Sequence, residues 1–152
     1  MSGSHTSAAH PRVVVQRASR AAHIPTDSRI RHWARAALPR AASVTVRYVG
    51  EGEGRRLNRE YRGRDYATNV LGFVYEKRPL AGDIVICAPV VAREARAQGK
   101  SALAHHAHLL VHGLLHLQGY DHEATRDAAR MEKRERAVLA RLGFRDPYAP
   151  PA

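Results

Sequence analysis

The chain has 152 residues, enough for one domain with a substantial hydrophobic core, and a formal net charge of +11. Cys87 is its only cysteine, which excludes an internal disulfide and indicates a reducing compartment, the cytoplasm. No apolar run approaches the roughly 20 residues that span a bilayer, and the N-terminal residues lack the apolar core of a secretory signal, so no membrane partner is expected.

The first half of the chain is expected to alternate strands and helices. An apolar run predicts a strand over 12–17, and Thr26 is a suitable N-cap for the helix that follows. Alternating valines predict a second strand over 43–49. A glycine-rich turn at 50–52 then leads into a short helix over about 53–61.

The second half begins with two β-rich segments, 70–75 and 83–87, joined by a loop that contains Pro79 and Gly82. Three helices with suitable start and stop residues follow, over about 89–98, 101–117 and 124–142. The middle one carries a stripe of leucines at helical spacing, so it is expected to pack on the sheet.

These elements predict a small α/β fold with about four strands and about five helices. One domain is expected over residues 12–145, because no linker or internal repeat divides it. Residues 1–11 are predicted to be a disordered N-terminal tail, and the proline-rich residues 146–152 a flexible C-terminal tail. Cys87 follows an apolar run and is expected to be buried.

Three histidines at the spacing H-x3-H-x5-H are the main chemical feature: His112, His116 and His122. A helix places His112 and His116 one turn apart on one face, where both can reach one ion. Gly119 can end that helix, so that His122 approaches the same ion from another direction, and Asp121 is expected to orient a ligand histidine. Three histidines leave a fourth position for water, which is typical of a catalytic zinc, so one Zn²⁺ per chain is predicted.

The same histidine frame occurs in metzincin peptidases, which carry H-E-x-x-H-x-x-G-x-x-H. Gly113 stands where those enzymes have the glutamate that acts as general base, so a metallopeptidase is an alternative that lacks its base. His105 and His108 share the face of the ligand pair and could line a cleft. Solvated helix positions fit them better, and they are not predicted to be ligands.

Arginines supply most of the 25 basic residues. A positive charge of this size favours a polyanionic partner, of which nucleic acid is the obvious one. GC-rich coding also produces a composition rich in arginine and alanine, so charge alone does not identify the partner.

The segment HGLLHLQGYDH, residues 112–122, resembles the signature of the YbeY family of bacterial endoribonucleases. Other family motifs have counterparts in the same order: LNREYR at 57–62, TNVLGF at 68–73, GDIVIC at 82–87, MEKRE at 131–135 and LGF at 142–144. The resemblance covers roughly residues 43–144. It departs from the family pattern at Gly72, where serine is usual, at Val74, where proline is common, and at 77–79, where Lys-Arg-Pro replaces an acidic stretch.

This resemblance implies a metal-dependent, single-strand-specific endoribonuclease that matures the 3′ end of 16S ribosomal RNA and takes part in ribosome quality control. Its implied partners are single-stranded RNA, the ribosomal RNA of the small subunit and the ribosome. It also implies a mixed α/β layer with the zinc cleft on one side. Arg62 is predicted to clamp the scissile phosphate, because a guanidinium binds phosphate in bidentate fashion. Further RNA-binding candidates are Arg59, Thr68 and Asn69.

A second alternative is a non-catalytic ribosome-binding factor whose zinc only stabilises the fold. It predicts RNA binding without metal-dependent cleavage, and no residue of the sequence stands out as a general base. Tyr61 and Phe73 are expected in the core. Glu132 and Glu135 are expected to pair with neighbouring arginines on the surface of the last helix.

Overall fold

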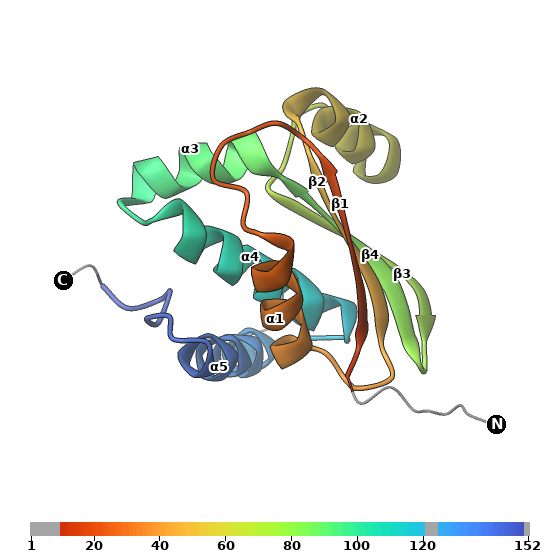
Figure 1. Cartoon of the computed structure of the whole chain (residues 1–152), viewed down its shortest axis with the longest axis vertical. Helices are drawn as coiled ribbons and strands as arrows, with labels where there is room; N and C mark the ends of the chain where they lie inside the picture. The colour runs from red at the N-terminus through yellow and green to blue at the C-terminus, as the bar shows by residue number, and fades with distance from the viewer. Residues whose placement is uncertain (1–9, 121–124, 151–152) are drawn as a thin grey trace.

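The computed structural model describes residues 10–120 and 125–150 of the chain. In chain order the elements are β1 (Arg12–Ala18), α1 (Asp27–Ala37), β2 (Ser43–Val49), α2 (Glu51–Arg62), β3 (Val70–Lys77), β4 (Leu80–Cys87), α3 (Ala88–Gln98), α4 (Ala102–Leu117) and α5 (Thr125–Arg141). The predicted α/β fold with about four strands and about five helices is confirmed (Figure 1). None of the helices in these residues is long and apolar enough to cross a lipid bilayer.

The strands form one mixed sheet in the order β1-β2-β4-β3. β1, β2 and β4 run parallel, whereas β3 pairs antiparallel with β4. A tight hairpin joins β3 to β4, while the parallel pair β1 and β2 is joined through α1, as parallel pairing requires. β3 is therefore an edge strand.

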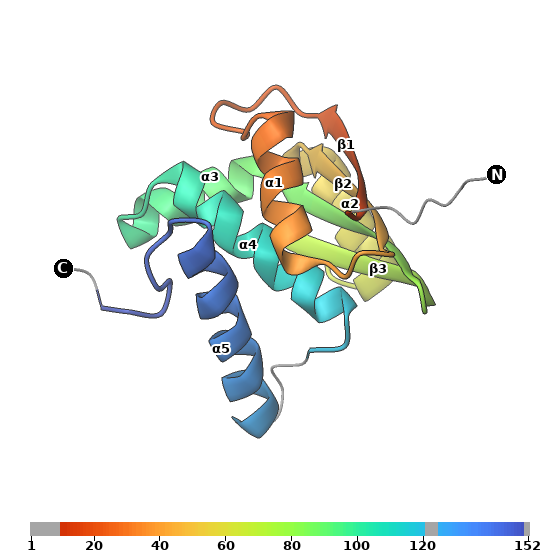
Figure 2. The same ribbon diagram turned by 60° about the horizontal axis from the view of Figure 1, so that its bottom comes forward.

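Successive side chains along a strand point to opposite faces of the sheet, and both faces carry apolar residues. Ile84 and Ile86 of β4 belong to the larger core, which includes residues of α1, α4 and α5. Val85 and Cys87 belong to a smaller cluster, against which Leu57 of α2 packs. Figures 1 and 2 show α1 and α4 against one side of the sheet, with α5 beside α4. The predicted burial of Cys87 is confirmed.

Side-chain N-caps begin α1 and α4, the first of them as predicted. Thr26 accepts a hydrogen bond from the Arg29 backbone N–H at 3.3 Å, and Ser101 accepts one from the Ala104 N–H at 3.0 Å. Each cap satisfies a backbone donor that has no partner inside its helix. The start of α4, which carries the histidines, is thus fixed by local sequence.

Gly113 lies where α4 packs against β3 and β4. A Cβ atom there would stand 3.1 Å from Ile84 Cδ1 and 3.1 Å from Val70 Cγ2, tighter than ordinary van der Waals contact. The missing side chain therefore lets α4 approach β3 and β4. Leu110 and Leu114 of the predicted apolar stripe are fully buried, as expected.

Two predicted boundaries are wrong. α2 begins at Glu51, so the turn predicted at 50–52 is instead the start of the helix, where Glu51 and Glu53 compensate the helix dipole. β4 begins at Leu80, so Gly82 lies inside the strand and not in a loop. Pairing with β2 on one side and β3 on the other extends β4 there, which is a long-range effect.

The predicted tails lie partly outside the described residues, at 1–9 and 151–152. Residues 146–150 are described, and they lie against α5. Asp146 forms an ion pair with Arg136 at 3.1 Å, and the Tyr148 hydroxyl donates to Glu135 at 2.6 Å. The chain after α5 thus turns back toward the helices.

Candidate metal centre

The end of α4 orients His116. Gly119 has a positive φ of 97°, in agreement with its predicted role in ending the helix. Its N–H bonds to the His116 carbonyl at 3.0 Å, and the Tyr120 N–H bonds to the Leu115 carbonyl at 3.2 Å, which is the pattern of a Schellman turn. The turn places the Tyr120 carbonyl 3.1 Å from His116 Nδ1, which donates to it.

His112 is held by Glu135 of α5. The His112 Nδ1–H donates to Glu135 Oε1 at 2.7 Å. The other carboxylate oxygen accepts from His108 Nε2 at 3.0 Å and from the Tyr148 hydroxyl at 2.6 Å. Glu135 is 0% exposed, and a buried carboxylate is costly unless its oxygens are bonded in this way.

Burial alone would raise the pKa of the Glu135 carboxyl. The hydrogen bonds from His108, His112 and Tyr148 outweigh that effect and lower the pKa to about 2. Burial, together with the bond to Glu135, raises the pKa of the Tyr148 hydroxyl above its usual range. At neutral pH the carboxylate is therefore an anion that accepts, and the tyrosine is a neutral donor.

The two α4 histidines present the tautomer that a zinc ligand needs. Each donates the proton on Nδ1 to a fixed oxygen, so the neutral ring carries its lone pair on Nε2. Histidines that bind zinc commonly donate their other nitrogen to a carboxylate or a backbone carbonyl. His112 and His116 therefore fit a zinc ion held through Nε2.

The predicted third ligand, His122, and the predicted supporting residue Asp121 lie outside the described residues. Within the described part of the chain, His108, His112 and Glu135 bring ligand atoms within 4.8 Å of one another. Their contacts of 2.7 and 3.0 Å are those of hydrogen bonds. Ligand atoms about 2.0–2.1 Å from a tetrahedral ion lie roughly 3.3 Å apart, so an ion would have to separate this set.

A groove of about 680 Å³ lies beside His116. Its walls are the end of α4, the chain between α1 and β2, and the β3–β4 hairpin. Lys77 and Arg78 of the hairpin line it together with His116. Two cations next to a candidate metal ligand suit an anionic partner.

Arg62, the predicted phosphate clamp, is the last residue of α2 and lies at edge strand β3. Its guanidinium donates to the Gly72 carbonyl at 2.9 Å and lies 5.3 Å from the centre of the Phe73 ring. Gly72 also faces α4, because a Cβ there would stand 3.1 Å from the Leu117 side chain. The fold thus brings Arg62 to a strand residue that contacts α4 next to His116.

The other RNA-binding candidates have partners within the protein. Arg59 lies 3.4 Å from Asp65 in an exposed ion pair. The Asn69 side chain donates to Glu94 of α3 at 3.1 Å, which ties the start of β3 to that helix. Thr68, which precedes Asn69 in the chain, is half-buried.

Three expectations about exposure are wrong. His105 is buried and bonded to Glu94 at 2.9 Å, and His108 is largely buried against Glu135, so neither is a solvated helix residue. Tyr61 is 59% exposed and not in the core, and its ring lies edge-on to Phe73 of the edge strand β3 at 5.3 Å between centres. The tertiary contacts of α3, α5 and β3 decide these positions.

Glu135 was missed as a site residue. It was expected to form a surface pair, as Glu132 does with Arg136 at 3.5 Å. A signal was present, since Glu135 lies at helical spacing between Met131 and Val138, which are both buried. A carboxylate on the apolar stripe of a helix must find its partners inside the protein.

The fold and these contacts define a small α/β protein with a candidate histidine metal centre on a helix that packs on a mixed sheet. The sequence profile of the family described as "Endoribonuclease YbeY" matches residues 16–143. The chain therefore belongs to the YbeY family.

Relatives in the same family are similar over most of the chain. A protein of Aromatoleum aromaticum named "Endoribonuclease YbeY" is 62% identical over 141 residues, which cover 90% of this chain and 92% of that protein. One of Verminephrobacter eiseniae with the same name is 58% identical and covers 79% of each chain. The solution structure of TM1509 from Thermotoga maritima matches with a TM-score of 0.56 at 23% identity, over 92% of this chain and 99% of that one, which shows a shared fold.

Proposed function

We propose that this protein is a zinc-dependent, single-strand-specific endoribonuclease that matures the 3′ end of small-subunit ribosomal RNA and acts in ribosome quality control. Its partners would be that RNA and the ribosome, in the cytoplasm. The observation that carries the proposal is the pair His112 and His116, whose Nδ1 protons are both engaged by fixed oxygens. Membership of the YbeY family supports the reaction class.

The metal would be held by His112, His116 and His122, and one ion per chain is expected. Zinc in such a site supplies a Lewis acid and lowers the pKa of bound water to about 7. Glu135 and the Tyr120 carbonyl hold two of the ligand rings in place.

The RNA would be bound by cations around the groove. Arg62 would hold the scissile phosphate, since the Gly72 and Tyr61 carbonyls take only part of the donor capacity of its guanidinium. Lys77 and Arg78 would hold neighbouring phosphates along the groove beside His116.

The peptidase alternative is not favoured by the packing. A Cβ atom at position 113 would stand 3.1 Å from Ile84 and 3.1 Å from Val70, so the glutamate that a metzincin needs there would be crowded against the sheet. The chain therefore shares the histidine spacing of metzincins but lacks their general base.

The test is cleavage of single-stranded ribosomal RNA by protein of measured zinc content, before and after chelation. Chelation should abolish cleavage, and added zinc should restore it. His116→Ala should lower bound zinc well below one per chain, whereas His32→Ala, at an exposed histidine of α1, should not. Full zinc in His116→Ala would show that the ligand assignment is wrong. RNA binding without cleavage by the zinc-loaded protein would favour a non-catalytic ribosome-binding factor.

A further inference from the structure

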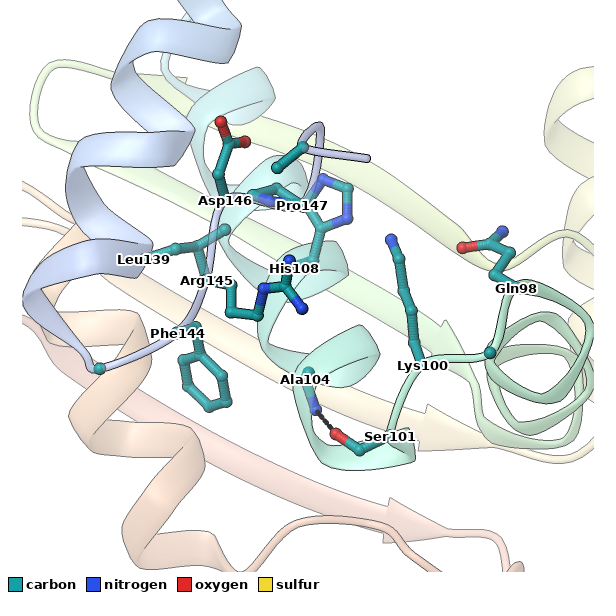
Figure 3. A pocket seen from close by; sticks show the side chains of 13 residues that line it. Gln98, Lys100, Ser101, Ala104, His108, Leu139, Phe144, Arg145, Asp146 and Pro147 are labelled. Carbon is teal, nitrogen blue, oxygen red and sulfur yellow. Dashed lines mark hydrogen bonds between the residues drawn. The ribbon is translucent and has the colours of Figure 1, made fainter. Parts of the chain in front are cut away.

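The chain that follows α5 returns to the candidate metal centre. The Tyr148 hydroxyl donates to Glu135 at 2.6 Å, and its ring meets the His108 ring edge-on at 5.4 Å between centres. Figure 3 shows His108 pointing from α4 toward this segment at Asp146 and Pro147. The family profile ends at residue 143, so Tyr148 lies beyond the part of the chain that it matches.

Tyr148 is fixed by its own segment and by α5. Its backbone N–H donates to Asp146 Oδ1 at 2.8 Å, and Asp146 pairs with Arg136 at 3.1 Å. The Arg136 guanidinium also lies 5.4 Å from the centre of the Tyr148 ring. These contacts hold the hydroxyl where it meets the buried carboxylate.

The two oxygens of the Glu135 carboxylate accept hydrogen bonds from different donors. Oε2 accepts from Tyr148 and His108, while Oε1 accepts from His112. Two donors on Oε2 resist rotation of the carboxylate, and so they keep Oε1 directed at His112 Nδ1. Since Glu135 is fully buried, solvent cannot replace a lost donor without opening the structure.

We propose that Tyr148 is a positioning residue of the metal centre, which acts through Glu135 to keep the His112 ring oriented so that Nε2 is its ligand atom. The C-terminal segment is then a working part of the site. This inference rests on the proposed function only in taking His112 as a metal ligand.

The experiment is titration of the metal-free, full-length protein with Zn²⁺ against a competing chelator. Glu135→Gln removes the charge that orients His112 and should weaken zinc binding about 10- to 100-fold. Tyr148→Phe removes one hydrogen bond to that carboxylate and should weaken zinc binding roughly two- to tenfold. The matched control is Tyr66→Phe, at an exposed tyrosine after α2, which should bind zinc like the unaltered protein.

A second measurement separates positioning from general stability. Nitrogen NMR of the metal-free protein should show His112 protonated at Nδ1, and Tyr148→Phe should shift the ring toward a mixture of tautomers. Unchanged zinc affinity together with an unchanged tautomer in Tyr148→Phe would overturn the inference. So would a lower melting temperature with unchanged zinc affinity, which is what a purely structural tyrosine predicts.

His116→Ala, titrated in parallel, distinguishes the two proposals. If it loses zinc while Tyr148→Phe binds normally, the proposed centre stands and the role of Tyr148 is wrong. If it keeps one zinc per chain, the proposed centre is wrong. The tautomer measurement, which is made on metal-free protein, then still shows whether Tyr148 orients the His112 ring.

Discussion

Arg62 is held at the edge of the sheet by the Gly72 carbonyl and the ring of Phe73, with its charge exposed. If it clamps the scissile phosphate, Arg62→Glu replaces attraction with repulsion at the reacting group and should remove nearly all RNA cleavage. Zinc content and melting temperature should stay unchanged. Arg62→Lys should recover part of the activity, because a point charge lacks the bidentate geometry.

The control for Arg62 is Arg56→Glu, which makes the same charge change at another exposed arginine of α2. It should retain most of the cleavage. A folded, zinc-loaded and fully active Arg62→Glu protein would move the search for the phosphate contact to Arg59 or to backbone groups near Thr68 and Asn69.

His106 makes the stability of the protein sensitive to acid. Burial disfavours the charged ring and lowers its pKa to about 4 from the ordinary 6.5, with a further contribution from His105. Between these values the unfolded chain binds a proton that the folded chain does not, so the free energy of unfolding falls as the pH falls through this window. The loss should reach about 2 kcal/mol at pH 5.

Urea unfolding at pH 7.5 and pH 5 measures this effect. His106→Leu places an apolar side chain that does not titrate beside Tyr48, and it should lose about 2 kcal/mol less between the two pH values than the unaltered protein does. His32→Leu, at an exposed position, should lose as much as the unaltered protein. An equal loss in all three would show that His106 is not the source.

At the scale of elements, the contact between α4 and the sheet depends on Gly113. Gly113→Glu would place a carboxylate between Ile84 and Val70, so it should destabilise the protein by about 3 kcal/mol in denaturant unfolding. It should not create cleavage of casein, although it restores the metzincin sequence. Gly113→Ala should change stability by less than about 1 kcal/mol, because the gain in helix propensity offsets the close contact. A stable Gly113→Glu protein with peptidase activity would contradict this account.

At the scale of the whole molecule, the charge of +11 should govern RNA binding. The affinity of metal-free protein for single-stranded RNA should fall steeply as salt rises, because phosphate contacts release counterions. The double variant Lys77→Ala/Arg78→Ala should reduce the slope of log affinity against log salt by about 1.4, which corresponds to two contacts on a single strand.

The control for that slope is Lys133→Ala/Arg141→Ala, which removes the same charge from exposed positions of α5. It should change the slope less. Binding that is flat in salt would remove the electrostatic argument for RNA, and equal slopes in both variants would show that the groove has no special part in binding.

Features that depend on neighbours along the chain could be predicted from the sequence. Caps at Thr26 and Ser101 and the apolar stripe of α4 follow local rules, and so does the turn at Gly119, because a few adjacent backbone and side-chain groups satisfy one another. The spacing of the histidines also belongs here, since a helix fixes which of them share a face.

Features that depend on distant segments follow instead from the packing of the folded chain. His112 and Glu135 are far apart in the sequence and meet because α5 packs on α4. Tyr148 reaches the same carboxylate from a segment that the sequence predicts to be a flexible tail. Pairing in the sheet likewise extended β4 to Leu80, and Tyr61 near the end of α2 lies exposed. Burial and long-range hydrogen bonds are properties of the assembled core, and no local pattern of the chain specifies which partners meet there.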